Sequence, residues 1–256
     1  MTRFATPSAA LLLAAAVATP THAQEEHGHV DALLIINPDN QLVAGGYDFE
    51  DNQVDNTQTR VFEGEFDAFG TIDEPGFNAL ASDNGQIPDG FSALPGNTDV
   101  TFTANAFSLA GQTANLWHWD AQGPVDFDPV TSGTTLTISK APAALFSAVL
   151  DGSASDVAGF TIETTSASGF LHKHIDFTVN QPVAEEGFYL WALTLEVGEY
   201  ATEPLYFVHG LGDHPESLHE AAVDYVQSNL VPEPAAGLLL ASLGAAVIGR
   251  RRRARA

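Results

Sequence analysis

Cysteine is absent from the 256-residue sequence, and methionine occurs once, at the initiator position. The absence of cysteine excludes disulfides, thiolate zinc sites, iron–sulfur clusters and cysteine nucleophiles. Basic residues are also scarce, since 9 lysines and arginines stand against 33 aspartates and glutamates and give a formal net charge of -24. So acidic a surface repels nucleic acid and anionic membranes but attracts divalent cations, which are the expected small partners.

The few basic residues gather at the two ends, and the N-terminal end has the pattern of an export signal. Residues 1–23 combine Arg3 with an apolar run over residues 9–18 and small residues before Gln24. This is the pattern of a secretory signal peptide, and the run is shorter than the roughly 20 residues that a membrane span needs. We expect cleavage between Ala23 and Gln24, with the segment 16–18 as the alternative position.

Residues 231–256 hold a second signal. Pro232, Glu233 and Pro234 precede an apolar run over residues 235–249, and an arginine cluster follows at Arg250, Arg251, Arg252 and Arg253. An apolar helix followed directly by arginines is a stop-transfer pattern. In this order, at the end of the chain, the three parts resemble the PEP-CTERM sorting signal of Gram-negative bacteria. An ordinary single-pass tail anchor is the alternative.

The resemblance to PEP-CTERM proteins carries implications for export and location. It implies translocation by the Sec machinery, a transient stay in the inner membrane and recognition by an exosortase that cleaves near the Pro-Glu-Pro motif. The processed protein would then reach the cell surface or the extracellular matrix of an exopolysaccharide-producing Gram-negative bacterium, either anchored or released.

Between the two signals, residues 24–230 form the expected exported domain, and its hydrophobic pattern has a period of two. Segments rich in β-branched and aromatic residues alternate with Asn, Asp, Gly and Pro, which predicts an antiparallel β-sandwich. The expected strands cover residues 30–36, 41–47, 59–66, 100–109, 114–119, 134–139, 158–164, 171–179, 188–197 and 205–209. Residues 67–97 are polar and are expected to form a loop-rich insertion.

One helix is expected just before the sorting signal. Asp213 offers a capping oxygen, Pro215 an early proline and Glu216 an acidic first turn. The helix is predicted to end near Ser228 and to close the domain against the sandwich. The residues expected on its buried face are Leu218, Ala221, Ala222 and Tyr225.

Two similar pentapeptides, His27–Asp31 and His172–Asp176, both read His-x-His-x-Asp. Side chains two residues apart on a strand share a face. His172 and His174 are therefore expected to point away from the core together, and a paired imidazole arrangement of this kind can hold one metal ion. Asp176 is a candidate third ligand or an orienting carboxylate. Imidazole with carboxylate favours Zn²⁺ over Mn²⁺, Ni²⁺ or Cu²⁺.

Other histidines complete or compete with this hypothesis. If the first strand pairs near the late one, His27 and His29 complete the metal site, and His209, at the end of its strand, is an additional candidate ligand. Ordinary surface polarity explains the pairs equally well. His118 is expected to be the polar member of an aromatic cluster, and capping and solvent exposure account for His214 and His219.

The body also resembles two families of surface proteins. The resemblance lies in the segments 28–31, 60–66, 73–77, 170–178, 186–190 and 203–208. Segments 28–31, 170–178, 186–190 and 203–208 are similar to the choice-of-anchor M domain, which is encoded beside metal ABC transporters. The same organisation is similar to a Zur-repressed PEP-CTERM family, which also carries segments 60–66 and 73–77. The resemblance implies a surface protein linked to zinc or manganese supply.

Catalysis is not expected. A metallo-β-lactamase needs a histidine directly after the aspartate of His-x-His-x-Asp, where this chain has Ala32 and Phe177. A cupin glutamate, a Gly-x-Ser-x-Gly elbow and a P-loop are also missing. Two functions remain: an exported protein that binds a divalent metal, with zinc favoured, or a non-catalytic structural component of extracellular matrix or biofilm whose histidines bind no specific ion.

Overall fold

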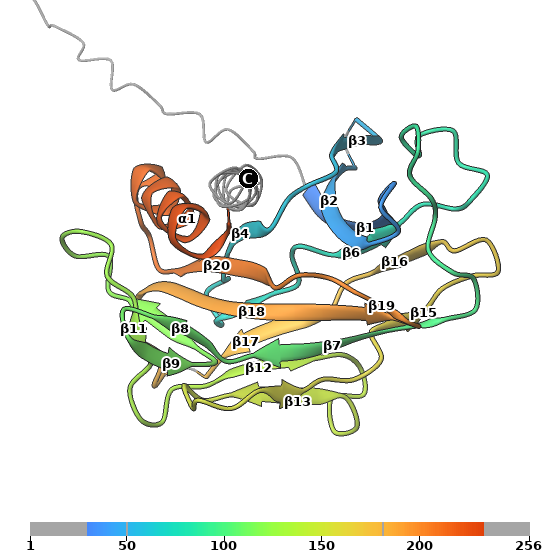
Figure 1. The fold of residues 1–256 in the computed structure, drawn as a ribbon. Coiled ribbons are helices and arrows are strands. Elements are labelled where there is room, and N and C mark those ends of the chain that lie inside the picture. The colour runs from blue at the N-terminus through green and yellow to red at the C-terminus, as the bar shows by residue number, and fades with distance from the viewer. Residues whose placement is uncertain (1–29, 50, 181, 233–256) are drawn as a thin grey trace, which may run out of the picture.

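The computed structural model describes residues 30–232, apart from residues 50 and 181. In this part the chain forms β-strands in several sheets and one helix, α1 (Glu216–Leu230) (Figure 1). The expected all-β fold with a single C-terminal helix is confirmed. None of the described residues belongs to a helix that is long and apolar enough to cross a membrane. The signal peptide and apolar run expected at the two ends lie outside the described residues.

The first sheet lies nearest the N-terminus of the described chain. Its five strands run in the order β16 (Leu171–Lys173), β6 (Phe77–Ala79), β1 (Val30–Ile36), β2 (Leu42–Asp48) and β3 (Gln53–Asn56). β1 and β2 form a regular hairpin around the turn at residues 37–41, where the side chain of Asn37 accepts hydrogen bonds from two backbone N–H groups. This local bonding places the acidic start of β1 beside the end of β2.

The second sheet is the largest and is organised around one long strand, β18 (Gly187–Val197). Its main path is β11 (Asp128–Pro129), β10 (Trp117–Trp119), β18, β20 (Leu205–Leu211) and β4 (Val61–Glu65). β7 (Asp99–Asn105) and β19 (Tyr200–Ala201) also pair with β18, and β14 (Val157–Ala158) and β15 (Glu163–Thr164) pair with β7. The third sheet comprises β13 (Ser147–Leu150), β12 (Leu136–Ser139), β17 (Asp176–Val179) and β5 (Thr71–Ile72), and a small hairpin joins β8 (Phe107–Leu109) to β9 (Gln112–Ala114).

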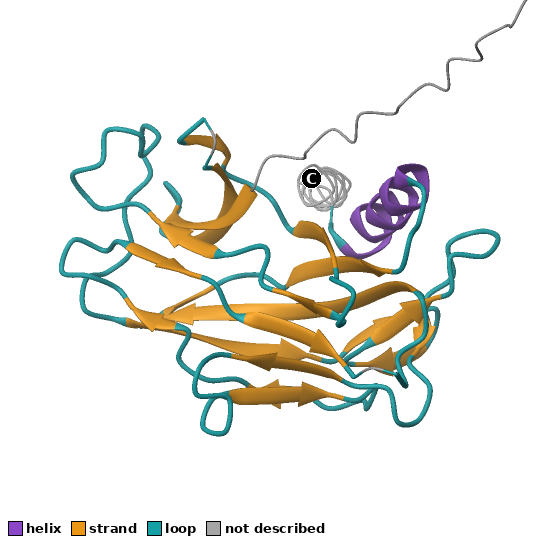
Figure 2. Ribbon diagram, turned by 180° about the vertical axis from the view of Figure 1, so that it is seen from behind, coloured by secondary structure: helices purple, strands orange, loops and turns teal. Residues whose placement is uncertain are grey.

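The second sheet is covered on both faces. Helix α1 lies over β20 and β4, and the third sheet lies on the opposite side (Figures 1 and 2). β18 therefore faces two cores: Tyr189 and Trp191 point into the main one, whereas Phe188 and Leu190 pack under the helix. Two-sided burial explains why this strand reads as a nearly continuous apolar run in the sequence.

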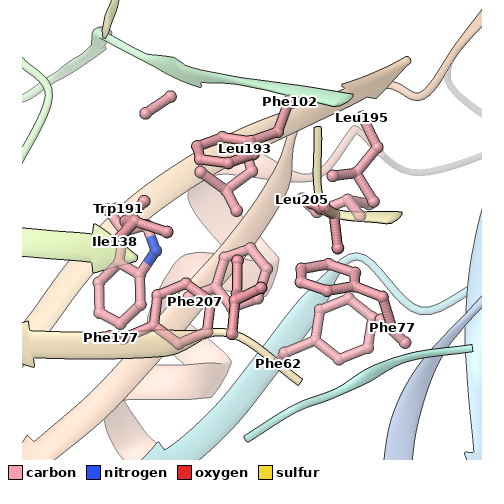
Figure 3. Packing of buried hydrophobic residues seen from close by; sticks show 14 of the residues in the cluster. Phe62, Phe77, Phe102, Ile138, Phe177, Trp191, Leu193, Leu195, Leu205 and Phe207 are labelled. Atoms are coloured by element: carbon pink, nitrogen blue, oxygen red, sulfur yellow. The ribbon is translucent and has the colours of Figure 1, made fainter. Parts of the chain in front are cut away.

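Aromatic rings form much of the main core. Trp191 and Phe207 are stacked with ring centroids 5.6 Å apart, and Phe177 packs against both (Figure 3). Burying one such side chain contributes roughly 1.5–3 kcal/mol relative to leaving it exposed. Because these rings come from β17, β18 and β20, the core ties the second and third sheets together.

Two pairings depart from the expected antiparallel arrangement. β6 is parallel to β1, and β4 is parallel to β20. β6 lies within residues 67–97, where we expected a loop-rich insertion. Its three residues are too few to show a period of two, so the sequence pattern did not reveal the strand.

Several expected strands are interrupted in the structure. The segment 171–179 is divided into β16 and β17, which belong to different sheets, because the chain crosses from one sheet to the other at His174 and Ile175. The segments 100–109 and 158–164 are also divided. β3, β11, β13 and β19 were not expected from the sequence, and each has at most four residues.

The helix begins differently from the expectation. Pro215 is the N-cap residue, no side chain makes a capping hydrogen bond, and the helix extends to Leu230 rather than Ser228. His219, Ala222 and Val226 are its buried residues, so the expected solvent exposure of His219 is wrong. The imidazole packs against Phe188, and its Nε2 lies 3.2 Å from the backbone carbonyl of Val208, so it belongs to the face of α1 that lies on the second sheet.

Candidate metal centre

Three strands of the first sheet bring distant polar residues onto one face. His172 on β16 lies opposite Asn78 on β6, and Asn78 in turn lies beside Leu33 on β1. Directly paired residues share a face, and so do residues two apart on one strand, so Asp31 joins this face. The other face carries Ala32 and other members of the main core. The polar residues therefore lie on the face of the first sheet that points away from the main core, at the start of β1.

The imidazoles of His172 and His174 converge with the carboxylate of Asp31. The two Nε2 atoms are 3.1 Å apart, and Nε2 of His172 is 3.4 Å from Oδ2 of Asp31. One ligand atom from each of the three residues lies within 4.8 Å of the other two. Ligands 2.0–2.2 Å from a tetrahedral zinc ion are about 3.3 Å from each other. The two separations that involve His172, 3.1 Å and 3.4 Å, are close to the edges of such a tetrahedron.

Asp31 is the most deeply buried of the three residues, with 1% of its surface exposed. Its Oδ1 accepts a hydrogen bond from the backbone N–H of Gly76 at 3.0 Å, whereas Oδ2 has no hydrogen-bond partner among the described residues. Burial raises the pKa of Asp31, the charge of Glu74 raises it further, and the two histidines oppose the shift. A buried carboxylate oxygen without a donor is an incomplete arrangement that a cation would complete.

The second nitrogen of His174 fixes how this ring is oriented. Nδ1 lies 3.0 Å from the backbone carbonyl of Asp73 and 3.6 Å from Oε1 of Glu74. A nitrogen that bonds to a carbonyl oxygen carries the proton, so the lone pair of His174 is on Nε2, facing His172. Histidine ligands of metals are commonly oriented in this way by a carbonyl or carboxylate at the other nitrogen. Asp73, Glu74 and His174 form a second group of possible ligands. In this group the backbone carbonyl of Asp73 and the carboxylate of Glu74 both face Nδ1 of His174, so they can orient the ring.

A glycine makes room for the convergence. A Cβ atom on Gly76 would lie 2.7 Å from Cε1 and Nε2 of His174 and 2.8 Å from Oδ1 of Asp31. Gly76 directly precedes β6, in register with Asp31 across the parallel pair, and its carbonyl accepts the N–H of Ala32. The absence of a side chain at this position is therefore a steric condition for the arrangement.

An aromatic ring holds His172 from the outer side. Phe49 stacks on the imidazole with centroids 4.6 Å apart and an interplanar angle of 23°, and Tyr47 meets Phe49 edge to face. The side chains of His172 and His174 remain 36% and 33% exposed. A solvated ion can therefore reach the two nitrogens while the ring stacking restricts the rotamers of His172.

The remaining predicted ligands lie elsewhere or outside the described residues. Asp176 is exposed on β17 in the third sheet, and it belongs to neither of the two groups of possible metal ligands that contain His174. His209 is fully buried between Phe66 and Trp191, and neither of its ring nitrogens has a hydrogen-bond partner in the described chain. Burial lowers the pKa of His209 to about 3. His27 and His29 precede the first described residue.

Sequence reasoning did not assign Asp31, Asp73 or Glu74 to the site. Asp31 closes the first His-x-His-x-Asp pentapeptide, so the motif contains a signal for it, but the spacing alone favours the two histidines as ligands over the aspartate. Asp73 and Glu74 lie in the segment expected to be a loop-rich insertion. Acidic residues are frequent in this sequence, so no single one can be recognised as a ligand from its position alone.

Three other histidines make contacts within the fold, away from the candidate metal centre. His118 lies beside Tyr189, and its Nε2 is 3.0 Å from the carbonyl of Glu186, in the aromatic environment expected for it. His214 bonds through Nε2 to the carbonyl of Leu211 at 3.0 Å. His219, on the buried face of α1, lies between the carboxylates of Glu63 and Glu65 on β4.

A comparison with protein families identifies one segment of the chain. Residues 230–253 match the PEP-CTERM protein-sorting motif, which includes Pro232-Glu233-Pro234 and the arginine cluster at residues 250–253. No curated protein matches the chain. The chain therefore carries a PEP-CTERM protein-sorting motif at its C-terminal end, which supports an exported, exosortase-sorted surface protein that is anchored in the membrane before processing.

Proposed function

We propose that this exported protein binds one divalent metal ion, with zinc favoured, through His172, His174 and Asp31. The observation that carries the proposal is the approach of two imidazole Nε2 atoms to 3.1 Å beside a buried carboxylate oxygen that has no hydrogen-bond donor among residues 30–232 as described. Two neutral imidazoles and one carboxylate offer a donor set that suits Zn²⁺.

The surroundings of the three ligands support the same function. The carbonyl of Asp73 orients His174, Phe49 packs on His172, and Gly76 leaves the space where the ligands meet. Supporting groups of this kind reduce the reorganisation that binding requires. With three protein ligands, a tetrahedral zinc ion keeps one further position for water or another side chain. We include His29 and His27, two and four residues before Asp31, as candidates for that position.

At the cell surface, such a site would capture or store metal after the protein has been sorted by exosortase. A formal charge of -24 raises the local concentration of divalent cations around the domain and so assists capture. Delivery to the surface or extracellular matrix of a Gram-negative bacterium belongs to the same proposal. No catalytic step is part of it.

The acidic surface also favours a second candidate function. A strongly charged, self-repelling domain is suited to a hydrated matrix, where it would act as a structural component beside exopolysaccharide. In that case the two histidines would retain no ion beyond the diffuse cation atmosphere of the surface. Induction by zinc starvation favours the first function, and co-expression with exopolysaccharide genes favours the second.

Elemental mass spectrometry tests the proposal. The full chain, purified in detergent and dialysed against trace zinc, is compared with the variant His172→Ala/His174→Ala and with the control His118→Ala/His214→Ala, which removes two histidines elsewhere. We expect a single retained zinc ion in the wild type and in the control, and its loss from the first variant. No retained zinc in the wild type, or equal retention in all three proteins, contradicts the proposal.

A further inference from the structure

A second buried oxygen without a partner lies beside the proposed metal site. Asn78 is 2% exposed, and its Oδ1 has no hydrogen-bond partner among the described residues. Buried side-chain oxygens nearly always accept a hydrogen bond, so an exception needs a physical reason. Asn78 and Asp31 both carry such an oxygen, and both lie on the sheet face that carries His172.

The strand register places the side chain of Asn78 within reach of the other ligands. Asn78 is the direct antiparallel partner of His172, and such pairs have Cβ atoms about 4.5–5.5 Å apart on the same face. On its other side, Asn78 is in register with Leu33, two residues after Asp31. The amide therefore lies between the strand that supplies His172 and the strand that supplies the carboxylate.

We propose that Asn78 supplies its amide oxygen as the fourth protein ligand of this metal ion. The inference rests on the proposed function, because it needs an ion between His172, His174 and Asp31. With Asn78, the donor set becomes two imidazole nitrogens and two oxygens. An added carbonyl oxygen suits the harder ion Mn²⁺, whereas Zn²⁺ is satisfied by the three other ligands and a water molecule.

This arrangement makes Asn78 the residue that determines metal preference. Without its oxygen, the site keeps the nitrogen-rich set that holds Zn²⁺ but loses one of two protein oxygens available to Mn²⁺. We expect Mn²⁺ binding to depend on Asn78 more strongly than Zn²⁺ binding does. Both unpartnered oxygens, on Asn78 and on Asp31, would then be satisfied by the same ion.

The alternative is a purely structural amide. If the amide were turned, its NH₂ group could donate to the carboxylate of Asp31, and Asn78 would position that residue without touching the ion. Asn78→Asp separates the two roles, because an aspartate still offers an oxygen to a metal but has no N–H to donate. Asn78→Leu keeps the approximate shape of the side chain and removes both polar atoms.

The test uses the full chain in detergent, with Mn²⁺ binding followed by the electron paramagnetic resonance signal of the free ion and Zn²⁺ binding by competition with a chelating dye. Asn78→Ala and Asn78→Leu should each weaken Mn²⁺ binding at least about tenfold and Zn²⁺ binding less. Asn78→Asp should bind both ions at least as tightly as the wild type. Thermal unfolding of the metal-free proteins shows that each variant is folded.

Two results overturn the assignment of Asn78 while leaving the proposed function intact. One is wild-type Mn²⁺ affinity in the folded Asn78→Leu variant. The other is loss of both ions from Asn78→Asp, which would assign the amide a structural role. If the wild-type protein binds neither Mn²⁺ nor Zn²⁺, the proposed function itself fails and the assignment of Asn78 fails with it.

Discussion

Nε2 of His172 lies 3.1 Å from Nε2 of His174, although β16 ends at Lys173, between the two residues. Two neutral imidazoles can approach so closely when one nitrogen donates to the lone pair of the other, or when both turn lone pairs toward a cation. The bond from Nδ1 of His174 to the carbonyl of Asp73 leaves the Nε2 lone pair of His174 available for either role. The predictions below separate a metal centre from a simple histidine pair.

Gly76→Ala should disrupt the metal site by steric contact alone. The added Cβ would lie 2.7 Å from His174 and 2.8 Å from Asp31, so the imidazole or the strand must move. We expect Zn²⁺ affinity to fall at least about tenfold, as measured by dye competition. Gly85→Ala is the matched control, because a Cβ there meets no atom within 4 Å. Equal zinc affinity in the two variants would contradict the close packing described at Gly76.

Asp31→Asn and Asp176→Asn should behave oppositely, although each removes one charge from a His-x-His-x-Asp motif. Only Asp31 converges with the two imidazoles, so only its replacement should abolish zinc retention. Burial raises the pKa of Asp31, so the ionised carboxylate lowers the stability of the metal-free fold as pH rises above 3.8. Metal-free Asp31→Asn should therefore unfold at the wild-type temperature or above it at pH 7, and added zinc should not stabilise it. If Asp176→Asn lost zinc and Asp31→Asn retained it, the assignment of Asp31 as the ligand would be contradicted.

The sequence indicated the histidine pair but not its carboxylate partner. The two imidazoles do meet, as the His-x-His spacing suggested, but not through a shared strand face, because β16 ends at Lys173 and His174 lies in the crossing to β17. Asp31 joins them only through β6, whose parallel pairing with β1 is non-local and whose three residues leave no periodic signal. His209 shows the opposite failure, since a histidine between aromatic rings in the core has the same local pattern as an exposed ligand.

His209 should make the domain labile to acid. Burial lowers its pKa to about 3, so the folded protein keeps the ring neutral, whereas the unfolded chain protonates it near 6.5. Stability is therefore fully present above pH 6.5 and is lost as pH falls toward 3, by about 5 kcal/mol in total. His209→Leu should reduce the acid-dependent loss in urea unfolding measured between pH 7 and pH 4. An unchanged pH dependence in that variant would contradict a buried neutral His209.

His219 should produce the opposite pH dependence. Burial alone would lower its pKa, but the nearby carboxylates of Glu65 and Glu63 and the backbone carbonyl of Val208 outweigh burial and raise it. Its Nδ1 and Nε2 lie 3.7 Å from Glu65 and 3.8 Å from Glu63. This stabilisation is fully present below pH 6.5 and is lost as pH rises through the raised value.

The variant His219→Gln tests this contribution, because glutamine keeps a polar side chain on the buried face of α1 but does not titrate. The unfolding temperature of the wild type should fall between pH 6 and pH 9 relative to that of the variant. The double variant Glu63→Gln/Glu65→Gln should remove the same pH dependence by removing the two carboxylates. A wild-type curve parallel to that of His219→Gln would show that the ion pairs under α1 contribute nothing.

X-ray absorption spectroscopy at the zinc edge tests the metal centre most directly. The zinc-loaded full chain should show at least two imidazole ligands together with oxygen donors at about 2.0–2.2 Å, and His172→Ala/His174→Ala should remove two imidazoles from the zinc ion. A zinc ion surrounded only by oxygen in the wild type, or unchanged imidazole scattering in the double variant, would contradict a metal centre built on His172, His174 and Asp31.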